Sequence, residues 1–475
     1  MSTSIKILAS TAAAAVLAAG CAAVGPNFQT PTAPSVDRYA MAGDAAPTLG
    51  AAQPPAGGWW TALGSAQLDA VMAQALKDNP TLAEADATLR RSQLQIAQAN
   101  ALIAPQVDGN AGVSRQRINT QQFGFTGFPS PTISLYSIGA SVSYDLDLFG
   151  GARRGLEAAQ ARAQEQARRT DAAYLTLTGN VAMQSVRIAA IRAQLDAART
   201  IVADGEQTLD IARKAEAAGA TSRSSLSPSV AQVAADRAQI APLEAQLNQA
   251  RHALALLVGQ APGAWSAPDF DLGAFVAPVA PPVSLPSELV RRRPDILAAE
   301  AALHAATAQI GVETAKLYPN VRLSAGYAQG ALKPGDLFSY DSSGWNFGPS
   351  VSLPLFDAGR RKAGRDAAKE EALAADARYR QTVLTAFGQV ADALDAIAHD
   401  DQELRAVQEQ ASAAQHAFDD QKRAFDLGGG TLLAMVDAQR QLARARRDLA
   451  RVQGNRYADL VRLYTAVAAD WRPAA

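Results

Sequence analysis

The stretch YSIGASVSYDLDL, residues 136–148, alternates larger apolar side chains with small or acidic ones at almost every step. Successive side chains of a β-strand point to opposite faces, so this stretch predicts a strand with one apolar and one polar face. An apolar face backed by small polar residues over about ten positions is what a strand of a membrane β-barrel requires. A half-buried strand of a soluble sheet has the same pattern, so alternation alone leaves both interpretations open.

Four such strands are predicted, two in each half of the chain. Residues 345–356 repeat the alternation of 136–148, and weaker partners lie near 107–117 and 321–329. Four strands cannot close a barrel, because the smallest membrane barrels have about eight. An open sheet in lipid would leave unpaired backbone groups, each costing several kcal/mol. If the membrane interpretation holds, several chains share one barrel, and three chains would supply twelve strands.

The same layout occurs twice, which predicts an internally duplicated protomer. Pro80 and Pro105 bracket a helical stretch in the first half, and Pro294 and Pro319 bracket one at the same spacing in the second. Each bracket is followed by two strand-like runs and then by a very long Ala-rich helical segment. Each long segment is interrupted by a Gly-Thr break, Gly219-Ala220-Thr221 in the first half and Gly430-Thr431 in the second.

The helical segments are too long for a compact domain. They cover residues 152–218, 222–258, 359–426 and 432–468. At 1.5 Å per residue, about 65 helical residues reach roughly 100 Å. Apolar residues recur at 3,4 spacing, which predicts coiled-coil packing, although an ordinary antiparallel bundle has similar spacing. Pro242 interrupts the first seam, so we expect a kink there.

The N-terminus predicts export. Residues 1–20 combine Lys6 with a run of about a dozen apolar residues, too short to span a bilayer as a mature helix. Cys21, the only cysteine, follows the run and rules out an internal disulfide. Its surroundings resemble a bacterial lipoprotein signal, in which cleavage leaves the cysteine lipid-modified; an ordinary signal peptide with an incidental cysteine is the alternative. Ala22, where aspartate would direct retention in the inner membrane, implies the outer membrane by the same resemblance.

Composition and motifs argue against other classes of function. The net charge of −1 gives no electrostatic footprint for nucleic acid. No Gly-rich phosphate loop, catalytic-triad spacing or metal cluster occurs, so we expect no enzyme, no cofactor and no metal site. Two cationic runs, Arg153-Arg154 and Arg360-Arg361-Lys362, stand where helices are expected to begin, which is electrostatically unfavourable. We expect them to face lipid or neighbouring acids at a membrane boundary, or else solvent.

Several short motifs in order resemble one family. They are Val24-Gly25-Pro26-Asn27-Phe28 after the cysteine, Arg292-Arg293-Pro294-Asp295-Ile296, Phe425-Asp426-Leu427-Gly428 and Val436-Asp437-Ala438-Gln439-Arg440. Together they resemble the TolC-like outer-membrane efflux channels, in the lipidated NodT/OprM-type branch that is paired with RND pumps. Each motif is weak alone, and their order and spacing over nearly the whole mature chain carry the resemblance.

The resemblance implies a mixed fold of long helices and a membrane β-barrel. A homotrimer would form a twelve-stranded barrel in outer-membrane lipid above a periplasmic α-barrel of coiled-coil helices. The implied segments are a signal peptide (1–20), a lipid-anchored extended segment (21–66), a first repeat (67–260), a linker or equatorial segment (261–286), a second repeat (287–469) and a C-terminal tail (470–475).

The resemblance also implies a function: a passive export duct for small toxic compounds, joined by a periplasmic adaptor to an inner-membrane RND-type pump. Gly219, Thr221, Gly430 and Thr431 would contact the adaptor, although helix-terminating turns alone would account for them. Asp437 would narrow the periplasmic aperture, although a solvated carboxylate near a helix start would account for it too. A second family acid, three residues earlier, is Ala434 here.

Two other functions remain compatible with the pattern. One is a lipid-anchored structural or adhesive coiled-coil protein of the envelope with a small soluble sheet. The other is a type I secretion duct, served by an ABC transporter rather than an RND pump. The sequence predicts no particular cargo, because a passive duct lined by small polar residues has little selectivity.

Overall fold

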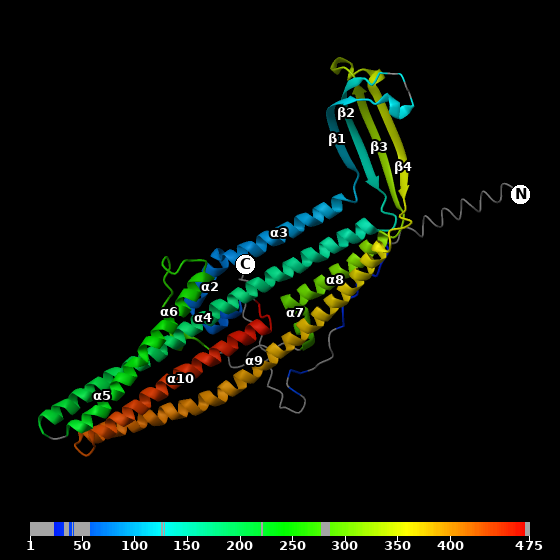
Figure 1. Ribbon diagram of the computed structural model, residues 1–475. Helices are drawn as coiled ribbons and strands as arrows, with labels where there is room; N and C mark the ends of the chain where they lie inside the picture. The colour runs from blue at the N-terminus through cyan, green and yellow to red at the C-terminus, as the bar shows by residue number, and fades with distance from the viewer. Residues whose placement is uncertain are drawn as a thin grey trace. The chain divides into compact units, whose positions relative to one another are not determined.

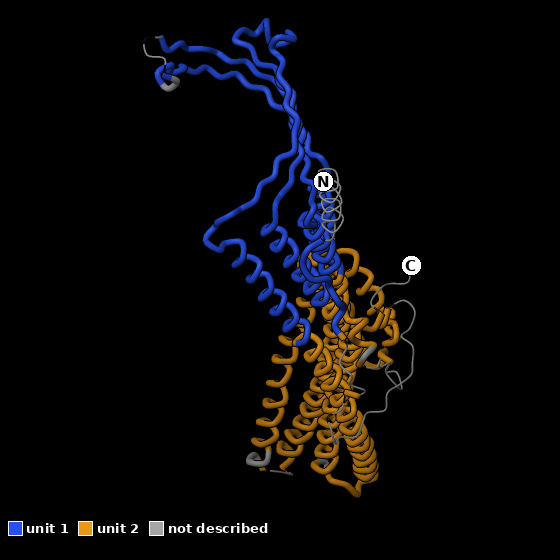
Figure 2. The backbone as a smooth tube through the Cα atoms, turned by 90° about the vertical axis from the view of Figure 1, so that its right-hand side faces the viewer, with its two compact units in different colours: residues 1–31, 88–167, 298–380 blue, residues 32–87, 168–297, 381–475 orange. Residues whose placement is uncertain are grey.

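The computed structural model describes residues 23–32, 38, 39, 41, 58–124, 127, 129–219, 222–276 and 286–470. The expected signal peptide, Cys21 and Thr221 lie outside these residues. The chain divides into two compact units (Figure 2). Unit 1 comprises residues 1–31, 88–167 and 298–380, and unit 2 comprises residues 32–87, 168–297 and 381–475. Each unit therefore draws on both sequence repeats.

The two repeats contain the same order of elements (Figure 1). The first comprises η1 (Trp59–Leu63), α2 (Ala66–Asp78), α3 (Pro80–Ala101), β1 (Gln106–Arg117), η2 (Thr120–Phe123), β2 (Thr132–Asp145), α4 (Gly151–Ala217), α5 (Arg223–Ala238) and α6 (Ile240–Leu257). After η3 (Leu272–Ala274), the second comprises α7 (Pro286–Arg292), α8 (Pro294–Ala315), β3 (Asn320–Ala331), η4 (Pro334–Asp336), η5 (Tyr340–Ser342), β4 (Ser343–Ser352), α9 (Arg360–Asp426) and α10 (Leu432–Ala466).

Proline sets the helix boundaries, as the brackets predicted. Pro80 and Pro294 are the first residues of α3 and α8, where the missing N–H has no intrahelical partner to lose. The Asn79 side chain caps α3 by accepting hydrogen bonds from the N–H groups of Thr81 (2.8 Å) and Leu82 (3.3 Å). The disturbance expected at Pro242 is a one-residue interruption, since α5 ends at Ala238 and α6 begins at Ile240, while Gln239 between them keeps right-handed helical angles. Pro242 cannot donate to the carbonyl of residue 238, and its ring clashes with that group.

The four strands form one antiparallel sheet in the order β1-β2-β3-β4, which confirms their predicted number and type. Strand β2 ends at Asp145 rather than 148, and Asp147, with φ of +45°, turns the chain toward α4. Strand β4 ends at Ser352 rather than 356, shortly before Pro354, which has no N–H to donate to a ladder. The predicted alternation places Ala140, Tyr327 and Trp345 in one row across three strands.

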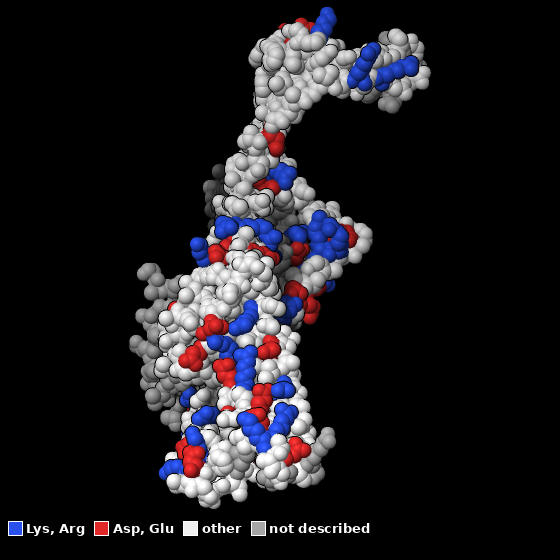
Figure 3. All heavy atoms as spheres, turned by 90° about the vertical axis from the view of Figure 1, so that its left-hand side faces the viewer, with Lys and Arg blue, Asp and Glu red and all other residues white. Residues whose placement is uncertain are grey.

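The apolar face of this sheet is uncovered in the single chain. Trp345 is 80% exposed and Phe347 67% exposed, and Val107, Val113 and Val351 are exposed as well. Figure 3 shows the strand region almost free of Lys, Arg, Asp and Glu except near its ends. An apolar surface of this kind, with no helix of unit 1 packed on it, requires a partner other than water.

Unit 2 has a core of its own. Its fully buried side chains come from η1, α2, α4 and each helix from α6 to α10, and they include Trp59, Leu68, Ile188, Leu254, Leu289, Ile296, Val390 and Tyr464. The Trp59 ring stacks on Tyr464 with centroids 5.3 Å apart, and its indole N–H donates to Thr178 Oγ1 at 3.4 Å. The predicted 3,4 seams are buried at their centres, at Leu247, Ala250 and Leu254 and at Ala438, Leu442 and Ala445. In the described part of the chain, no helix combines the length and the apolarity that crossing a bilayer demands.

Candidate functional site

The two predicted turns lie at the same end of unit 2, after α4 and after α9 (Figures 1 and 2). Gly219 has φ of +76°, and its N–H donates to the carbonyl of Glu216 at 2.8 Å. In the second turn, the left-handed position is Gly428, with φ of +78°, rather than Gly430. Left-handed backbone favours glycine because it has no Cβ.

Gly430 is required for a different reason, which is close backbone packing. The N–H groups of Gly429 and Gly430 both donate to the carbonyl of Ala424 at 2.9 Å. A Cβ on Gly430 would lie 2.9 Å from the backbone nitrogen of Phe425, so a side chain there would force the turn open. Thr431 then caps α10, its Oγ1 accepting a hydrogen bond from the N–H of Ala434 at 3.2 Å.

Two leucines beside the second turn are exposed. Leu427 belongs to the motif Phe425-Asp426-Leu427-Gly428, whereas sequence reasoning did not single out Leu433. Leu427 is 86% exposed and Leu433 69% exposed. Leu433, on α10, stands outside the 3,4 seam of that helix, and that departure is the signal that could have identified it. Together with the glycines, they give the turn an apolar surface on a backbone that another chain can approach closely.

Asp437 lies in the second turn of α10, with an exposed carboxylate 3.8 Å from Arg440 Nη1. The helix dipole acts mainly within the first turn, so the dipole adds little to the environment of Asp437. An exposed pair at this distance contributes at most about 1 kcal/mol. Arg440 Nε is buried without a hydrogen-bond partner in the described residues. The spacing of three residues between Asp437 and Arg440 was visible in the sequence, but the pair was not predicted.

A small cavity of about 220 Å³ lies between α4, α9 and α10 just beyond Asp437 along α10. Its polar lining includes Asp204, Gln415, Gln439 and Arg446. Arg446 donates to Gln415 Oε1 at 2.6 Å, which connects α10 to α9. Burial raises the pKa of Asp204, although Gln439 and Arg446 act in the opposite direction. The helices behind the turn are therefore joined by polar contacts as well as by apolar packing.

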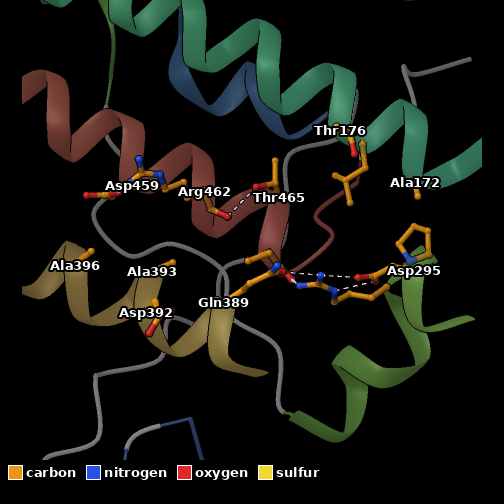
Figure 4. A pocket seen from close by; sticks show the side chains of 14 residues that line it. Ala172, Thr176, Asp295, Gln389, Asp392, Ala393, Ala396, Asp459, Arg462 and Thr465 are labelled. Carbon is orange, nitrogen blue, oxygen red and sulfur yellow. Dashed lines mark hydrogen bonds and ion pairs between the residues drawn. The ribbon is translucent and has the colours of Figure 1, made fainter. Parts of the chain in front are cut away.

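A larger cavity of about 620 Å³ lies where α8 begins, between α4, α9 and α10 (Figure 4). Arg293, which is buried, donates to the carbonyl of Ala466 at 2.8 Å, to Asp295 at 2.7 Å and to Gln389 Oε1 at 2.7 Å. The Arg-Arg-Pro-Asp-Ile motif thus connects the start of α8 to both α9 and α10. Its arginine is satisfied by protein atoms, which indicates a structural role.

An acidic pair lies between α9 and α10 in the same unit. Burial and the facing carboxylate of Asp459 raise the pKa of Asp400 to about 6, and Glu403 and Asp401 act in the same direction. Asp459 pairs with Arg462, and Asp401 accepts from Arg456 Nε at 2.5 Å. Sequence reasoning did not find this pair, because the two carboxylates are far apart along the chain.

In unit 1, the residues that follow the expected lipid anchor are fixed against the start of α4. The N–H of Val24 donates to the carbonyl of Phe149 at 3.0 Å. Buried Arg154 donates to the carbonyl of Val24 at 3.2 Å and to Asn27 Oδ1 at 2.6 Å. Gly25, with φ of +93°, lies so close to Gly311 that an added Cβ would be 2.5 Å from the Gly311 Cα. The Val-Gly-Pro-Asn-Phe motif therefore holds the chain at the junction of sheet and helices.

The cationic runs at the helix starts have acidic neighbours, which was one of the two expectations. Arg153 lies 3.3 Å from Asp147, and Arg154 lies 2.7 Å from Glu157. In the second repeat, Arg361 lies 3.4 Å from Asp357. Asp147 also accepts hydrogen bonds from the first N–H groups of α4, which offsets the unfavourable placement of cations there.

His304 has a packing role. It stacks on Phe28 with ring centroids 4.4 Å apart, and its Nε2 lies 3.0 Å from Glu157 Oε1. Burial raises the pKa of Glu157, but the hydrogen bonds and charges of Arg154 and His304 outweigh it and lower the pKa. Within the part of the chain that the structure describes, no three His, Cys, Asp or Glu side chains converge on a metal-sized space.

The chain matches the family described as outer membrane efflux protein over residues 71–260 and 285–469, and it belongs to that family. The pyoverdine export outer membrane protein OpmQ of Pseudomonas aeruginosa is 31% identical over 423 residues, which cover 87% of each chain. The cation efflux system protein CusC of Escherichia coli is 28% identical, covering 95% of this chain and 96% of its own.

Similar solved structures are also outer-membrane channels. The outer-membrane channel OprN superimposes with a TM-score of 0.84 at 26% identity, covering 95% of this chain and all of its own. The MtrE outer membrane channel of Neisseria gonorrhoeae, in its open state, superimposes with a TM-score of 0.82 at 28% identity, covering 94% of this chain and 98% of its own. The predicted resemblance to TolC-like channels is confirmed. The chain is an outer-membrane efflux channel protein rather than an adhesive coiled-coil protein.

Proposed function

We propose that three copies of this chain form a passive, lipid-anchored export duct that joins an inner-membrane pump to the cell exterior. The single observation that supports this most directly is the uncovered four-stranded sheet. Its edge strands β1 and β4 each pair on one side only among the described strands, and its apolar face lies open. A sheet cannot remain open in lipid, because its unpaired backbone groups each cost several kcal/mol.

Pairing β4 of one copy with β1 of the next satisfies both edges at once. Three copies would give twelve strands, an even number within the range of bacterial outer-membrane barrels. The small polar residues of the opposite face, among them Ser141, Ser324 and Gly348, would then line a water-filled lumen.

Lipid modification of Cys21 would add an anchor at the barrel's periplasmic rim. The described chain begins two residues after Cys21 and is at once fixed by Arg154 to the junction of sheet and helices. Two acyl chains are sufficient for stable anchoring, at roughly 0.8 kcal/mol per buried CH₂.

The helix turns of unit 2 would contact a periplasmic adaptor. Gly219, Thr221, Gly430 and Thr431 are the contact candidates, and the exposed Leu427 and Leu433 extend the same surface. Three copies of Asp437 would form a carboxylate ring at the aperture, which would attract cations and repel its own members. Ala434 supplies no second acid, so the ring would be single.

Cargo selection would belong to the pump and the adaptor. Relatives at 28–31% identity are named for pyoverdine export, for cation efflux and, in Pseudomonas putida, for toluene efflux, although their channels are alike enough to align nearly end to end. We therefore propose small toxic compounds as the cargo and an RND-type pump as the partner. A type I secretion duct would use the same channel with an ABC transporter.

The decisive experiment combines fractionation with deletion. The proposed function predicts a heat-sensitive oligomer in the outer-membrane fraction and, on deletion, increased susceptibility to a panel of toxic compounds. A monomer that becomes water-soluble when its lipid is removed would contradict the proposal.

The adaptor contact has its own test. Thr431→Cys introduces a thiol at the second turn, while Cys21, the only native cysteine, would be acylated. A photoactivatable crosslinker on residue 431 should capture a periplasmic adaptor, and Arg405→Cys, far along α9 from the turn, serves as the control. Equal capture from both positions would argue against a specific contact.

A further inference from the structure

One feature of the sheet is not explained by an apolar band and a polar lumen. On β1, the face that carries Val107, Gly109, Ala111 and Val113 continues with two arginines, Arg115 and Arg117. The register places them beside Ser134 and Thr132 of β2, on the face that also carries Tyr136 and Ile138. The cations therefore lie on the apolar side of the sheet, beyond the last apolar row.

These arginines have no acidic partner among the described residues. The segment between Asp108 and Asp145 contains no Asp or Glu. Both side chains are exposed, neither forms an ion pair within the described chain, and Arg117 Nε makes only a long contact of 3.4 Å with the carbonyl of Ser130. An arginine pair that faces lipid without a counter-charge is unfavourable unless an anion is present.

The position along the strand identifies the kind of anion. Strand β1 follows α3 and strand β2 precedes α4, so Gln106 and Asp145 mark the end of the sheet next to the helices. Arg115 and Arg117 lie at the far end, where β1–β2 pairing continues past Tyr136, the last β2 residue paired with β3. If the helices lie in the periplasm, as proposed above, the arginines reach the headgroups of the outer leaflet.

The chemistry of the pair suits phosphate. Two residues apart on one face of a strand, the side chains leave the backbone about 7 Å from each other. Each guanidinium can bind a phosphate in bidentate fashion, and the hydroxyls of Ser134 and Thr132 lie beside them as further donors. The equivalent hairpin of the second repeat has no such pair: its apolar face ends in Gln329, Ser343 and Ala331, and its loop contains Lys333 together with Asp336 and Asp341.

We infer that Arg115 and Arg117, with Ser134 and Thr132, form a binding site on each subunit for the phosphate groups of outer-leaflet lipids. This inference depends on the proposed membrane placement of the sheet. The site would hold phosphorylated lipid at the rim of the barrel and so fix the depth of the β1–β2 hairpin in the leaflet.

The test uses the full-length protein in phosphatidylcholine vesicles that contain either diphosphoryl lipid A or the same lipid without its phosphates. After detergent extraction, mass spectrometry measures the lipid A retained per protein. Each arginine near an anionic surface contributes about 1 kcal/mol, so the pair predicts about thirtyfold preference for the phosphorylated lipid. R115Q/R117Q should abolish that preference.

Matched variants distinguish this site from general attraction. K333Q, in the equivalent hairpin, should retain the preference. R115Q/R117Q/Q116R moves a positive charge to the lumenal face and should not restore it. Equal retention of the two lipids by the native protein, or unchanged preference in R115Q/R117Q, would overturn the inference. So would displacement by millimolar inorganic phosphate, which would assign the site to the free anion.

The proposed function is measured separately on the same samples. Heat-sensitive oligomers and conductance in planar bilayers should persist in R115Q/R117Q, because strands pair through backbone groups that the substitutions leave intact and neither side chain lines the lumen. Loss of lipid preference with conductance intact supports the lipid site. A native protein without oligomers or conductance would contradict the proposed function instead.

Discussion

Tryptophan is buried in the helical core of unit 2 and exposed in the sheet of unit 1. Trp59 is completely buried between α4 and α10, whereas Trp345 on β4 is 80% exposed. In unit 2, helices of one chain supply both sides of the core. In the sheet, the apolar side chains of Trp345, Phe347 and Val351 are exposed in the single chain. The helical core is therefore complete within one chain, while the proposed function assigns the open sheet to lipid and to further copies.

Substitution of the two tryptophans should give the largest difference between the two regions. Trp59→Ala should lower the free energy of unfolding of the helices by about 3–5 kcal/mol, because it leaves a cavity beside Tyr464 and removes the hydrogen bond to Thr178. Far-UV circular dichroism during denaturant unfolding measures the loss. Trp345→Ala is the matched control and should leave helix unfolding unchanged. A similar effect of both substitutions would show that the two regions do not differ.

A charge on either face of β4 tests the sheet alone. Phe347→Arg places a cation on the apolar face and should cost about 2–4 kcal/mol in the membrane. Asn346→Arg places the same cation on the polar face, one residue away, and should be tolerated. Heat-sensitive oligomers on gels report the result. Oligomers that survive Phe347→Arg but not Asn346→Arg would reverse the assignment of the two faces.

The acidic pair between α9 and α10 is an exception within the well-packed unit. The pKa of Asp400, raised to about 6, means that the folded state holds the proton more tightly than the unfolded state. The stabilisation of the folded state by this bound proton is fully present below about pH 4 and is lost as the pH rises through about 6. Asp400→Asn should therefore stabilise the protein by roughly 1 kcal/mol at pH 8, after allowance for solvent screening, and by nothing at pH 4.

Denaturant titrations at both pH values measure this difference. The exposed Asp395, one helical turn earlier on α9, is the matched control, and Asp395→Asn should change little at either pH. Stabilisation by Asp400→Asn that is equal at pH 4 and pH 8 would mean that the proton is not held at this pair.

The smallest effect on stability is expected at Asp437. Asp437→Asn should change the free energy of unfolding by less than about 1 kcal/mol, because its pair with Arg440 is long and exposed. Its effect should appear in function: single-channel conductance should rise if a cation shared by the carboxylate ring holds the aperture closed against the repulsion of its members. Arg440→Gln removes the ion pair with Asp437 but keeps the proposed carboxylate ring, so it distinguishes the effects of the two. Unchanged conductance in both variants would remove Asp437 from the gate.

Local chemistry made most of the fold predictable. Pro80, Pro294 and Pro242 act through a missing N–H, and Gly219 and Gly428 act through left-handed backbone, so helix boundaries follow from a few neighbouring residues. The alternation of the strands likewise needs only successive positions. The ends of β2 and β4 were placed too late, because alternation continues past the point where Asp147 and Pro354 interrupt the ladder.

The candidate site was only partly predictable. The turns were predicted from the two Gly-Thr breaks, the gating role of Asp437 was implied by the family resemblance and stays a prediction, and Arg440 could have been found from its spacing. The Asp400–Asp459 pair and the contact of Arg293 with Ala466 could not, because each joins residues far apart in sequence. Such contacts depend on how the helices pack side by side.

By itself, the sequence determined the duplication, the type of each element and the two faces of each strand, because backbone periodicity and proline and glycine chemistry act over a few residues. Only the tertiary structure decided which charges meet, which acidic side chains face one another and which apolar residues remain uncovered. Those outcomes depend on the register between strands and the packing between distant helices, which no local pattern records.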